Sequence, residues 1–338
     1  MNELLKSCVN GATMNETEAH SIMCDMMTGS LSAVEIGGLL SVLAYRGETA
    51  EEITGFVRAM REQAHTIDGP EHVVDTCGTG GDGSSTFNIS TAAAIIASSA
   101  GAKIAKHGNR SVSSKSGSAD VLEYLGVSIQ TSPEETIQSI ERRNMGFLYA
   151  PSYHSSMKHV AGARKDLAFR TVFNLLGPLS NPMKAKRQVI GVYSIEKAKL
   201  MARALEAFEP EHALFVSSRD GLDELSITSP TDVIELKGGK TYEYTVEPGD
   251  VGLPLGRLSD IQVATPEESG RLIVDILKNR GPDSAVHIAA FNAGAALYAA
   301  EQAADLNEGV ALALEAVASG EALNQLERLK QKEEELYA

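Results

Sequence analysis

Residues 72–108 read HVVDTCGTGGDGSSTFNISTAAAIIASSAGAKIAKHG, and this stretch decides the fold class. It contains a short β-rich run, a glycine-rich loop, an apolar helix of small residues and a second β-rich run. A strand, helix and strand in that order predict two parallel neighbours in one sheet. We therefore expect an α/β domain with a mostly parallel central sheet.

The alternation continues toward the C-terminus. Further strands are expected at 128–131, 145–151, 187–194 and 212–218, and further helices at 119–126, 132–144 and through Phe208. A hairpin is predicted around Gly238-Gly239, within 232–248, and helices from Glu267 onward.

The N-terminal segment has a different pattern, helical throughout. Asn15, Ser32 and Thr49 each precede a glutamate by three residues, which is the pattern of a helix capping box. The turn-forming run Asp68-Gly69-Pro70 then interrupts the helical pattern. We expect a small all-helical domain over 1–67 and a large α/β domain over 71–338.

The overall charge restricts the partners. The formal net charge is −15 and the isoelectric point is about 5.0, so we expect neither nucleic acid nor membrane as a partner. An anionic substrate would need a local basic site, with a metal ion to help. Three scattered cysteines (Cys8, Cys24 and Cys77) and no signal peptide favour a cytoplasmic protein.

Gly78, Gly80 and Gly83 match the dinucleotide fingerprint G-x-G-x-x-G, but the surrounding residues do not. Asp82 lies in the loop where it would repel a pyrophosphate, unless it contacts a sugar hydroxyl or a metal-bound water. The helix does not begin at once, and Lys103 and Lys106 occupy the region where a ribose-binding acid is expected. The nicotinamide interpretation is therefore weak.

Two neighbouring segments point to a phosphorylated ligand instead. Residues 88–91 (NIST) open the apolar helix, and a helix N-terminus after a glycine loop offers free N–H groups to an anion. Residues 106–118 carry three cations, one histidine and five serines in an otherwise acidic chain. These residue types suit a multiply charged phosphate at the end of a strand.

Two further candidates lie downstream. Asp223 and Glu224, in the run DGLDE at 220–224, supply adjacent carboxylates of the kind that bind hard cations. Taken alone, a turn with solvated acids explains them better, and the metal interpretation gains weight only from the phosphate site implied upstream. Arg164 and Arg170 precede an Asn-x-x-Gly-Pro turn, where an arginine can hold a substrate carboxylate.

Taken together, these motifs make the chain resemble the anthranilate phosphoribosyltransferases of tryptophan biosynthesis. The matching segments are GTGGD (78–82), NIST (88–91), KHGNRSVSSKSGSADVLEYLG (106–126), RTVFNLLGPLSNP (170–182) and DGLDE (220–224). The resemblance implies a two-domain fold like that of nucleoside phosphorylases, with a segment near 160–190 returning to the helical domain. It also implies a homodimer.

The resemblance further implies the reaction, in which the amine of anthranilate displaces pyrophosphate from 5-phosphoribosyl 1-pyrophosphate. The implied phosphoribosyl pyrophosphate contacts are Gly78, Gly81, Asp82, Thr86, Asn88, Ile89, Ser90, Thr91, Lys106, His107, Gly108, Asn109, Arg110, Ser111, Val112, Ser113, Ser114 and Ser118. Ser90, Asp223 and Glu224 would hold two magnesium ions per subunit. Anthranilate would contact Gly78, Asn109 and Arg164, with His107, His154 and Pro178 lining its access channel.

Two other functions stay open at this point. A pyrimidine nucleoside phosphorylase shares GTGGD but would not need DGLDE. A non-catalytic, nucleic-acid-binding relative would lack the metal acids or Arg164 and would carry a broad basic face.

Overall fold

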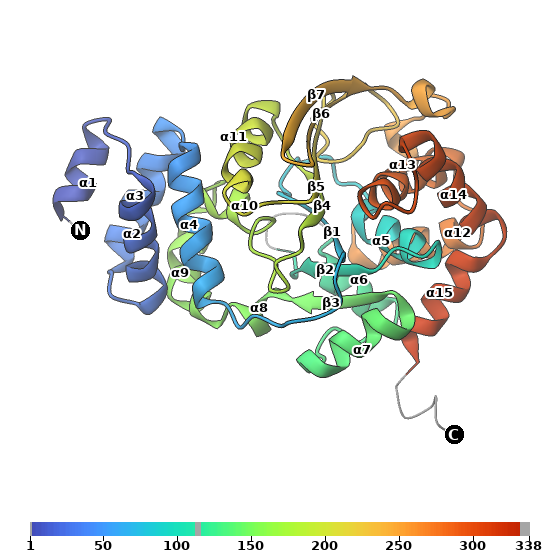
Figure 1. Cartoon of the computed structure of the whole chain (residues 1–338), viewed down its shortest axis with the longest axis horizontal. Helices are drawn as coiled ribbons and strands as arrows, with labels where there is room; N and C mark the ends of the chain where they lie inside the picture. Colours follow the sequence, from blue (N-terminus) through green and yellow to red (C-terminus); the bar gives the residue numbers. More distant parts are fainter. Residues whose placement is uncertain (1, 112–115, 332–338) are drawn as a thin grey trace.

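A computed structural model describes residues 2–111 and 116–331 (Figure 1). Four helices begin the chain: α1 (Asn2–Val9), α2 (Glu16–Thr28), α3 (Ala33–Arg46) and α4 (Ala50–Gln63). The capping boxes expected at Asn15, Ser32 and Thr49 are all formed, so the predicted helix starts are confirmed. Each cap supplies partners for N–H groups that the first helical turn leaves free.

A seven-stranded sheet forms the centre of the rest of the chain, in the order β3-β2-β1-β4-β5-β6-β7. Strands β1 to β5 run parallel, and β6 and β7 form an antiparallel hairpin beside β5. The bounds are β1 Val74–Gly78, β2 Ile104–Gly108, β3 Met145–Tyr149, β4 Arg187–Gly191, β5 His212–Ser218, β6 Thr231–Lys237 and β7 Lys240–Val246. The mostly parallel sheet and the hairpin around Gly238-Gly239 are confirmed.

The strand expected at 128–131 is wrong. These residues form an irregular connection between α6 (Ser118–Tyr124) and α7 (Pro133–Arg143), and β3 follows only after α7. Ile129 is buried in the core all the same. Its burial explains the apolar pattern, because a connecting segment can cover a core without joining the sheet.

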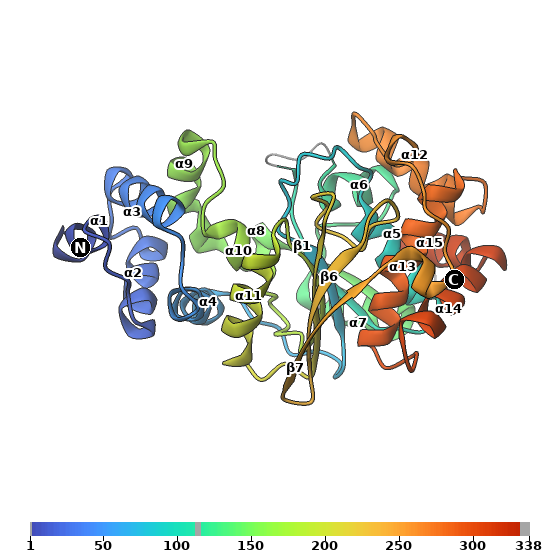
Figure 2. The ribbon, with the colours of Figure 1, turned by 90° about the horizontal axis from the view of Figure 1, so that it is seen from above.

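Two apolar cores lie on opposite faces of the sheet. One core joins α5 (Ile89–Ser99) and α12 to α15 to the face of the sheet that carries Val189, Leu214 and Val216. The other joins α1–α4, α9, α10 and α11 to the face that carries Ile190, Ala213 and Phe215. Neighbouring residues of one strand thus enter different cores, as the two-residue period of a strand requires. Figure 2 shows these layers on either side of the strands.

The remaining helices complete the layers: α8 Ala150–Tyr153, α9 Lys158–Leu167, α10 Phe173–Leu176, α11 Ile195–Glu206, α12 Pro266–Leu277, α13 Asp283–Ala299, α14 Leu306–Ala318 and α15 Glu321–Lys330. Short 3₁₀ turns occupy Ser155–Met157, Pro248–Val251 and Leu258–Asp260. Helix α9 packs against α2 and α3, although more than a hundred residues separate it from them in the sequence (Figures 1 and 2).

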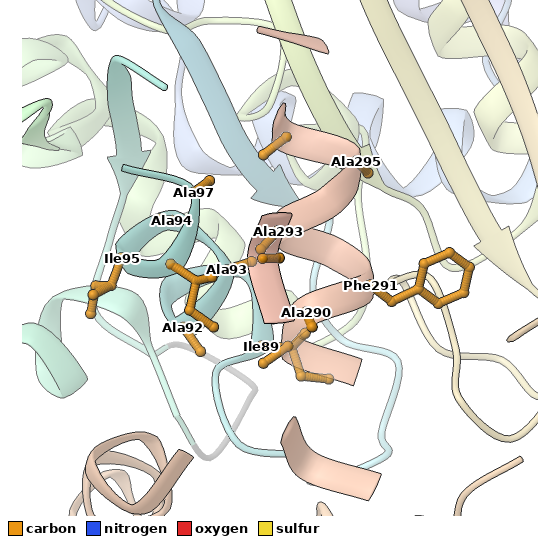
Figure 3. Packing of buried hydrophobic residues seen from close by; sticks show 14 of the residues in the cluster. Ile89, Ala92, Ala93, Ala94, Ile95, Ala97, Ala290, Phe291, Ala293 and Ala295 are labelled. Carbon is orange, nitrogen blue, oxygen red and sulfur yellow. The ribbon is translucent and has the colours of Figure 1, made fainter. Parts of the chain in front are cut away.

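Small side chains allow α5 and α13 to pack closely. Ala93 of α5 faces Ala293 of α13, and both helices contribute several alanines to one buried cluster (Figure 3). Alanine adds no bulk between two backbones, so the helix that follows the glycine loop is held firmly. In the described part of the chain, no helix combines the length and apolar character needed to cross a membrane.

Candidate active site

Most of the predicted ligand contacts collect at the carboxyl edge of the parallel strands. The glycine loop follows β1, residues 109–111 follow β2, and the Asp223-Glu224 loop follows β5. In open α/β sheets the loops at this edge form the ligand crevice. The sequence motifs are therefore brought together by strand direction, although they lie up to about 150 residues apart.

The glycine loop has a backbone that few other residues adopt. Gly80, Gly81 and Gly83 all have positive φ angles, of 65°, 75° and 78°. Asp82 turns its carboxylate onto the following residues: Ser84 donates its backbone N–H (3.1 Å) and its hydroxyl (2.5 Å). Asp82 therefore helps to hold the loop closed on itself.

The loop joins α5 through an extended segment and not directly. Thr86 pairs with Gln262 in an isolated antiparallel bridge, and the N–H of Phe87 donates to the Ile261 carbonyl. Asn88 then caps α5, because its Oδ1 accepts the N–H of Thr91 at 3.0 Å. Ile89 is buried, whereas Ser90 lies at the helix end and is partly exposed.

Lys106 reaches the end of α5 from β2. Its Nζ donates to the Thr76 carbonyl (2.5 Å) and to the Ser90 hydroxyl (3.1 Å), and the side chain is only 1% exposed. Burial lowers the pKa of this lysine, while the carboxylate of Asp75 acts in the opposite direction. The lysine thus places a cation beside the N-terminus of α5.

Lys103 has a different position from the one that its place in the sequence suggested. It precedes β2 and is exposed at the amino end of the sheet, and its carbonyl accepts the N–H of Val74. It therefore belongs to the edge opposite the candidate site, and of these two lysines only Lys106 faces α5.

The segment after β2 folds back onto α6. An added Cβ at Gly108 would lie 2.2 Å from the Ser118 hydroxyl, so Gly108 and Ser118 are in close contact. Asn109 is exposed, and its Oδ1 accepts the N–H of Arg110 at 2.7 Å. The N–H of Ser111 donates to Asp120. Val112, Ser113 and Ser114 lie outside the described residues.

Arg110 pairs with acids of its own chain. Its guanidinium donates to Asp120 (2.9 Å) and to Glu123 (2.8 Å), which raises its pKa. The Arg110 side chain is 40% exposed, so the pairing is one that a phosphate group could replace.

Asp223 and Glu224, in the loop that follows β5, face the glycine loop. The N–H of Gly80 donates to Asp223 Oδ2 at 2.7 Å, and an added Cβ at Gly78 would lie at the same distance from that oxygen. Burial, reinforced by the nearby charge of Asp82, raises the pKa of Asp223 to about 6. Burial and the charge of Asp223 raise the pKa of Glu224 well above its usual value. Two carboxylates under mutual repulsion favour a cation.

The donor set fits magnesium shared with a phosphorylated ligand. Across residues 2–111 and 116–331, no group of three or more His, Cys, Asp or Glu side chains is arranged to hold a metal ion. Mg²⁺ at phosphate sites takes one or two protein carboxylates, with water and phosphate oxygens completing the octahedron. Asp223, Glu224 and the Ser90 hydroxyl match that partial set.

His107 and His154 form a buried pair below this edge. Their ring centroids are 5.3 Å apart, and Nε2 of His107 and Nδ1 of His154 have no hydrogen-bond partner. Burial, with the neighbouring His154, lowers the pKa of His107 to about 3, and burial lowers the pKa of His154 as well. Both rings are therefore neutral near pH 7. Pro178 is buried, and its carbonyl accepts the side-chain amide of Gln188.

The two arginines lie on the side of the helical core. Arg164, on α9, stacks over the ring of Phe173 with 4.9 Å from its guanidinium carbon to the ring centroid. Burial lowers its pKa. Arg170 stacks on Tyr193 and borders the loop, because an added Cβ at Gly81 would lie 3.0 Å from its Nε. Of the two, Arg170 is the one in contact with the glycine loop.

Sequence reasoning missed Asp75, which is fully buried between β1 and β2. Strands β1 and β2 are paired at Val74 and Ile104. Beyond that pair, side chains form hydrogen bonds with the backbone groups of these strands. Asp75 accepts the N–H of His107 at 3.0 Å, and the amide of Asn181 donates to Asp75 and to the Ala105 carbonyl. The only sequence signal was an acid inside a predicted buried strand, which is unusual without a partner.

Comparison with known proteins agrees with this geometry. A model of the glycosyl transferase family a/b domain matches residues 70–323, and one of the family's helical bundle domain matches residues 2–64. A protein of Bacillus licheniformis named anthranilate phosphoribosyltransferase is 97% identical over the full length of both chains. The chain belongs to the anthranilate phosphoribosyltransferase family.

Solved structures of anthranilate phosphoribosyltransferases share the fold. That from Thermus thermophilus is 42% identical and superimposes with a TM-score of 0.89 over 96% of this chain and 98% of its own. The Saccharomyces cerevisiae enzyme, in complex with PRPP and Mg, is 28% identical with a TM-score of 0.87 over 96% and 95%. The structure of the yeast enzyme in complex with 4-fluoroanthranilate is 27% identical in sequence to this chain. It superimposes with a TM-score of 0.84 over 96% of this chain and 95% of its own.

These findings identify the chain as an enzyme of tryptophan biosynthesis. Anthranilate phosphoribosyltransferase is a glycosyltransferase that moves the phosphoribosyl group of 5-phosphoribosyl 1-pyrophosphate to the amine of anthranilate. Of the alternatives left open by the sequence, neither the nucleoside phosphorylase nor the non-catalytic relative matches the family found.

Proposed function

We propose that this chain forms N-(5-phosphoribosyl)anthranilate and pyrophosphate at the edge formed by β1, β2 and β5. The observation that carries the proposal is the convergence of Lys106 and Glu224 on Ser90, at the N-terminus of α5. Asp223 lies next to Glu224 and accepts the N–H of Gly80 in the glycine loop. A cation, a carboxylate pair and a helix N-terminus at one point suit a magnesium pyrophosphate.

We assign the phosphoribosyl pyrophosphate contacts to the glycine loop, the α5 terminus and the segment after β2. The assigned residues are Gly78, Gly81, Asp82, Thr86, Asn88, Ile89, Ser90, Thr91, Lys106, His107, Gly108, Asn109, Arg110, Ser111, Val112, Ser113, Ser114 and Ser118. The positive φ angles of Gly80 and Gly81 support this assignment, since they let the loop backbone approach a ligand closely.

Magnesium would be held by Ser90, Asp223 and Glu224, and we propose two ions per subunit. Bound magnesium supplies neutralisation of the charge that develops on the departing pyrophosphate. The protein's own part is to hold the carboxylates beside Lys106, so that the ligand meets both kinds of charge at once.

Anthranilate would bind beside Gly78 and Asn109, with Arg164 pairing with its carboxylate and His107, His154 and Pro178 lining its access. An arylamine has a free lone pair at neutral pH, so no strong base is needed to begin the attack. The His–carboxylate pairs among the described residues (His20–Glu62, His72–Glu211 and His212–Glu235) all lie away from this edge. We infer that positioning and leaving-group stabilisation supply the catalysis.

The activity is tested by mixing the protein with Mg²⁺, 5-phosphoribosyl 1-pyrophosphate and anthranilate, and following the loss of anthranilate fluorescence. Asp223→Asn combined with Glu224→Gln should reduce turnover strongly and raise the Mg²⁺ requirement. Unchanged turnover of that variant at saturating Mg²⁺ would contradict the assigned metal role. Phosphorolysis of thymidine or uridine without any fluorescence loss would indicate a nucleoside phosphorylase.

We also propose the domain division: 1–67 with a returning segment near 160–190 as the helical domain, and 71–338 as the catalytic domain. The packing of α9 against α2 and α3 supports the returning segment. A homodimer through the helical end is supported by the exposed side chains of Val9, Val34 and Tyr45. Val34→Asp with Tyr45→Asp should then sediment as a monomer where the wild type sediments as a dimer.

A cytoplasmic location is proposed from the cysteines. Cys8, Cys24 and Cys77 are all free thiols, which suits a reducing compartment.

A further inference from the structure

Helix α13 is apolar along most of its length, yet it carries one buried amide. Asn292 is 3% exposed among alanines and aliphatic residues of the main core (Figure 3 shows its neighbours Phe291 and Ala293). A buried amide inside a helix lowers stability unless all of its polar atoms are hydrogen-bonded. Its presence there calls for a partner outside the helix.

That partner is the backbone of Leu225, which directly follows Asp223 and Glu224. The N–H of Leu225 donates to Asn292 Oδ1 at 2.9 Å, and Asn292 Nδ2 donates to the Leu225 carbonyl, also at 2.9 Å. The second hydrogen of Nδ2 goes to the Ile288 carbonyl at 2.9 Å. The amide thus satisfies both backbone groups of Leu225, the residue directly after Glu224.

The loop around Asp223 and Glu224 needs such an anchor. Asp223 is buried and Glu224 follows it directly, so the positions of both carboxylates depend on how the backbone of this loop is held. Other anchors include Gly191, against whose backbone the Asp223 carbonyl packs, and Asp220, which accepts hydrogen bonds from the hydroxyls of Ser226 and Thr228. Thr231 Oγ1 accepts the N–H of Ser226. Of these anchors, Asn292 is the one that fixes the peptide beside Glu224.

We propose that Asn292 is a positioning residue: its side-chain amide pairs with the Leu225 peptide and thereby holds Asp223 and Glu224 in the geometry that binds magnesium. It does not touch substrate or metal. The inference rests on the proposed metal role of these two carboxylates, and it assigns the rigidity of their loop to the packed helix α13. Partners that orient metal ligands typically contribute about 10- to 100-fold to metal affinity.

The test compares Asn292→Ala with Gln325→Ala in the full-length enzyme. Gln325, on α15, is an equally buried amide, and its Nε2 donates to Ser98 Oγ and the Arg143 carbonyl, on the outer side of α5. Both variants lose a buried amide and should lose stability. Only Asn292→Ala should raise the Mg²⁺ concentration for half-maximal rate, by about 10- to 100-fold, with the KM for anthranilate within about twofold of wild type.

A second readout does not depend on turnover. In the metal-free protein, peptides covering 219–230 should exchange their amide hydrogens about tenfold or more faster in Asn292→Ala, and at the wild-type rate in Gln325→Ala. If Asn292→Ala cannot be produced as folded protein, Asn292→Asp is the substitute. It keeps the shape and one acceptor of the side chain but loses the donor to the Leu225 carbonyl. It should also raise the Mg²⁺ requirement and speed amide exchange over 219–230.

Wild-type exchange over 219–230 together with an unchanged Mg²⁺ requirement would overturn the proposal. Equal shifts in Gln325→Ala would overturn it too, because they would indicate general loosening of the core. Failure of the proposed function would be seen separately, as absence of turnover in the wild type. The comparison of amide hydrogen exchange over 219–230 would still decide whether Asn292 holds the loop.

Discussion

The replacement of Gly191 by alanine tests whether the carboxylate loop depends on close contact with β4. An added Cβ would lie 1.6 Å from the Asp223 carbonyl oxygen and 2.6 Å from its carbonyl carbon. Since Cβ atoms are not found within 3.0 Å of such atoms, the Asp223 backbone must move by at least the difference between 3.0 and 1.6 Å, about 1.4 Å. Both contacts are to backbone, so no side-chain rotation can relieve them.

A displacement of that size changes the position of the carboxylate pair relative to Lys106 and α5. Misplacement of reacting groups by about 1 Å can lower rates about 100-fold, and forced overpacking costs about 1–3 kcal/mol of stability. We therefore expect kcat/KM for 5-phosphoribosyl 1-pyrophosphate to fall about 100-fold, measured by the fluorescence assay, with a lower urea midpoint.

The matched control is Gly249→Ala, because an added Cβ there has no neighbour within 4 Å and the residue has no positive φ. It should keep wild-type activity and stability within about 0.5 kcal/mol. A Gly191→Ala enzyme with kcat/KM within twofold of wild type and an unchanged urea midpoint would refute the reasoning from backbone contact.

Three further predictions concern ionisable side chains. His107 has a pKa of about 3 in the folded protein, against 6.5 as a free side chain. Between pH 6.5 and pH 3 the histidine is therefore protonated in the unfolded chain and neutral in the folded protein. The free energy of unfolding accordingly falls as the pH is lowered from 6.5 toward 3. From pH 7 to 5 the histidine should account for a loss of about 2 kcal/mol in urea unfolding, absent in His107→Asn; equal pH dependence would contradict this. Glu52 is fully buried and pairs with Arg46, so Glu52→Gln should cost about 3 kcal/mol or more of unfolding free energy, whereas an unchanged urea midpoint would show that the pair is dispensable. Loss of the charged contact in Arg164→Gln should raise the KM for anthranilate about 10- to 100-fold, and an unaltered KM would remove Arg164 from the anthranilate site.

The sequence predicted the architecture well where local rules govern it. The capping boxes at Asn15, Ser32 and Thr49 place three helix starts correctly, because a cap depends only on residues within one turn. The expected strand at 128–131 was wrong because Ile129 is buried without pairing, and burial alone does not distinguish a strand from a connection. Lys103 was misplaced for a similar reason, since one or two residues decide at which end of a strand a side chain lies.

The candidate site divides in the same way. The types and order of Lys106, Ser90 and the Asp223-Glu224 pair can be read in the sequence, and they indicate a phosphate and a hard cation. Asp75 and Asn292 could not be found there, because their partners are backbone groups of distant segments: the N–H of His107 for one and the peptide of Leu225 for the other. A buried acid or amide in an apolar run indicates an unseen partner without identifying it.

The sequence by itself determined the helical start of the chain, the α/β alternation, the glycine loop and the residue types that suit a magnesium pyrophosphate. These features depend on periodicity, on caps and on chemistry within short segments. The tertiary structure alone decided that Lys106 meets Ser90, that Asp223 rests on Gly191 and that α13 holds Leu225. Those contacts join segments far apart in the chain, and they form because parallel strands bring their carboxyl ends to one edge while packed helices hold the loops there.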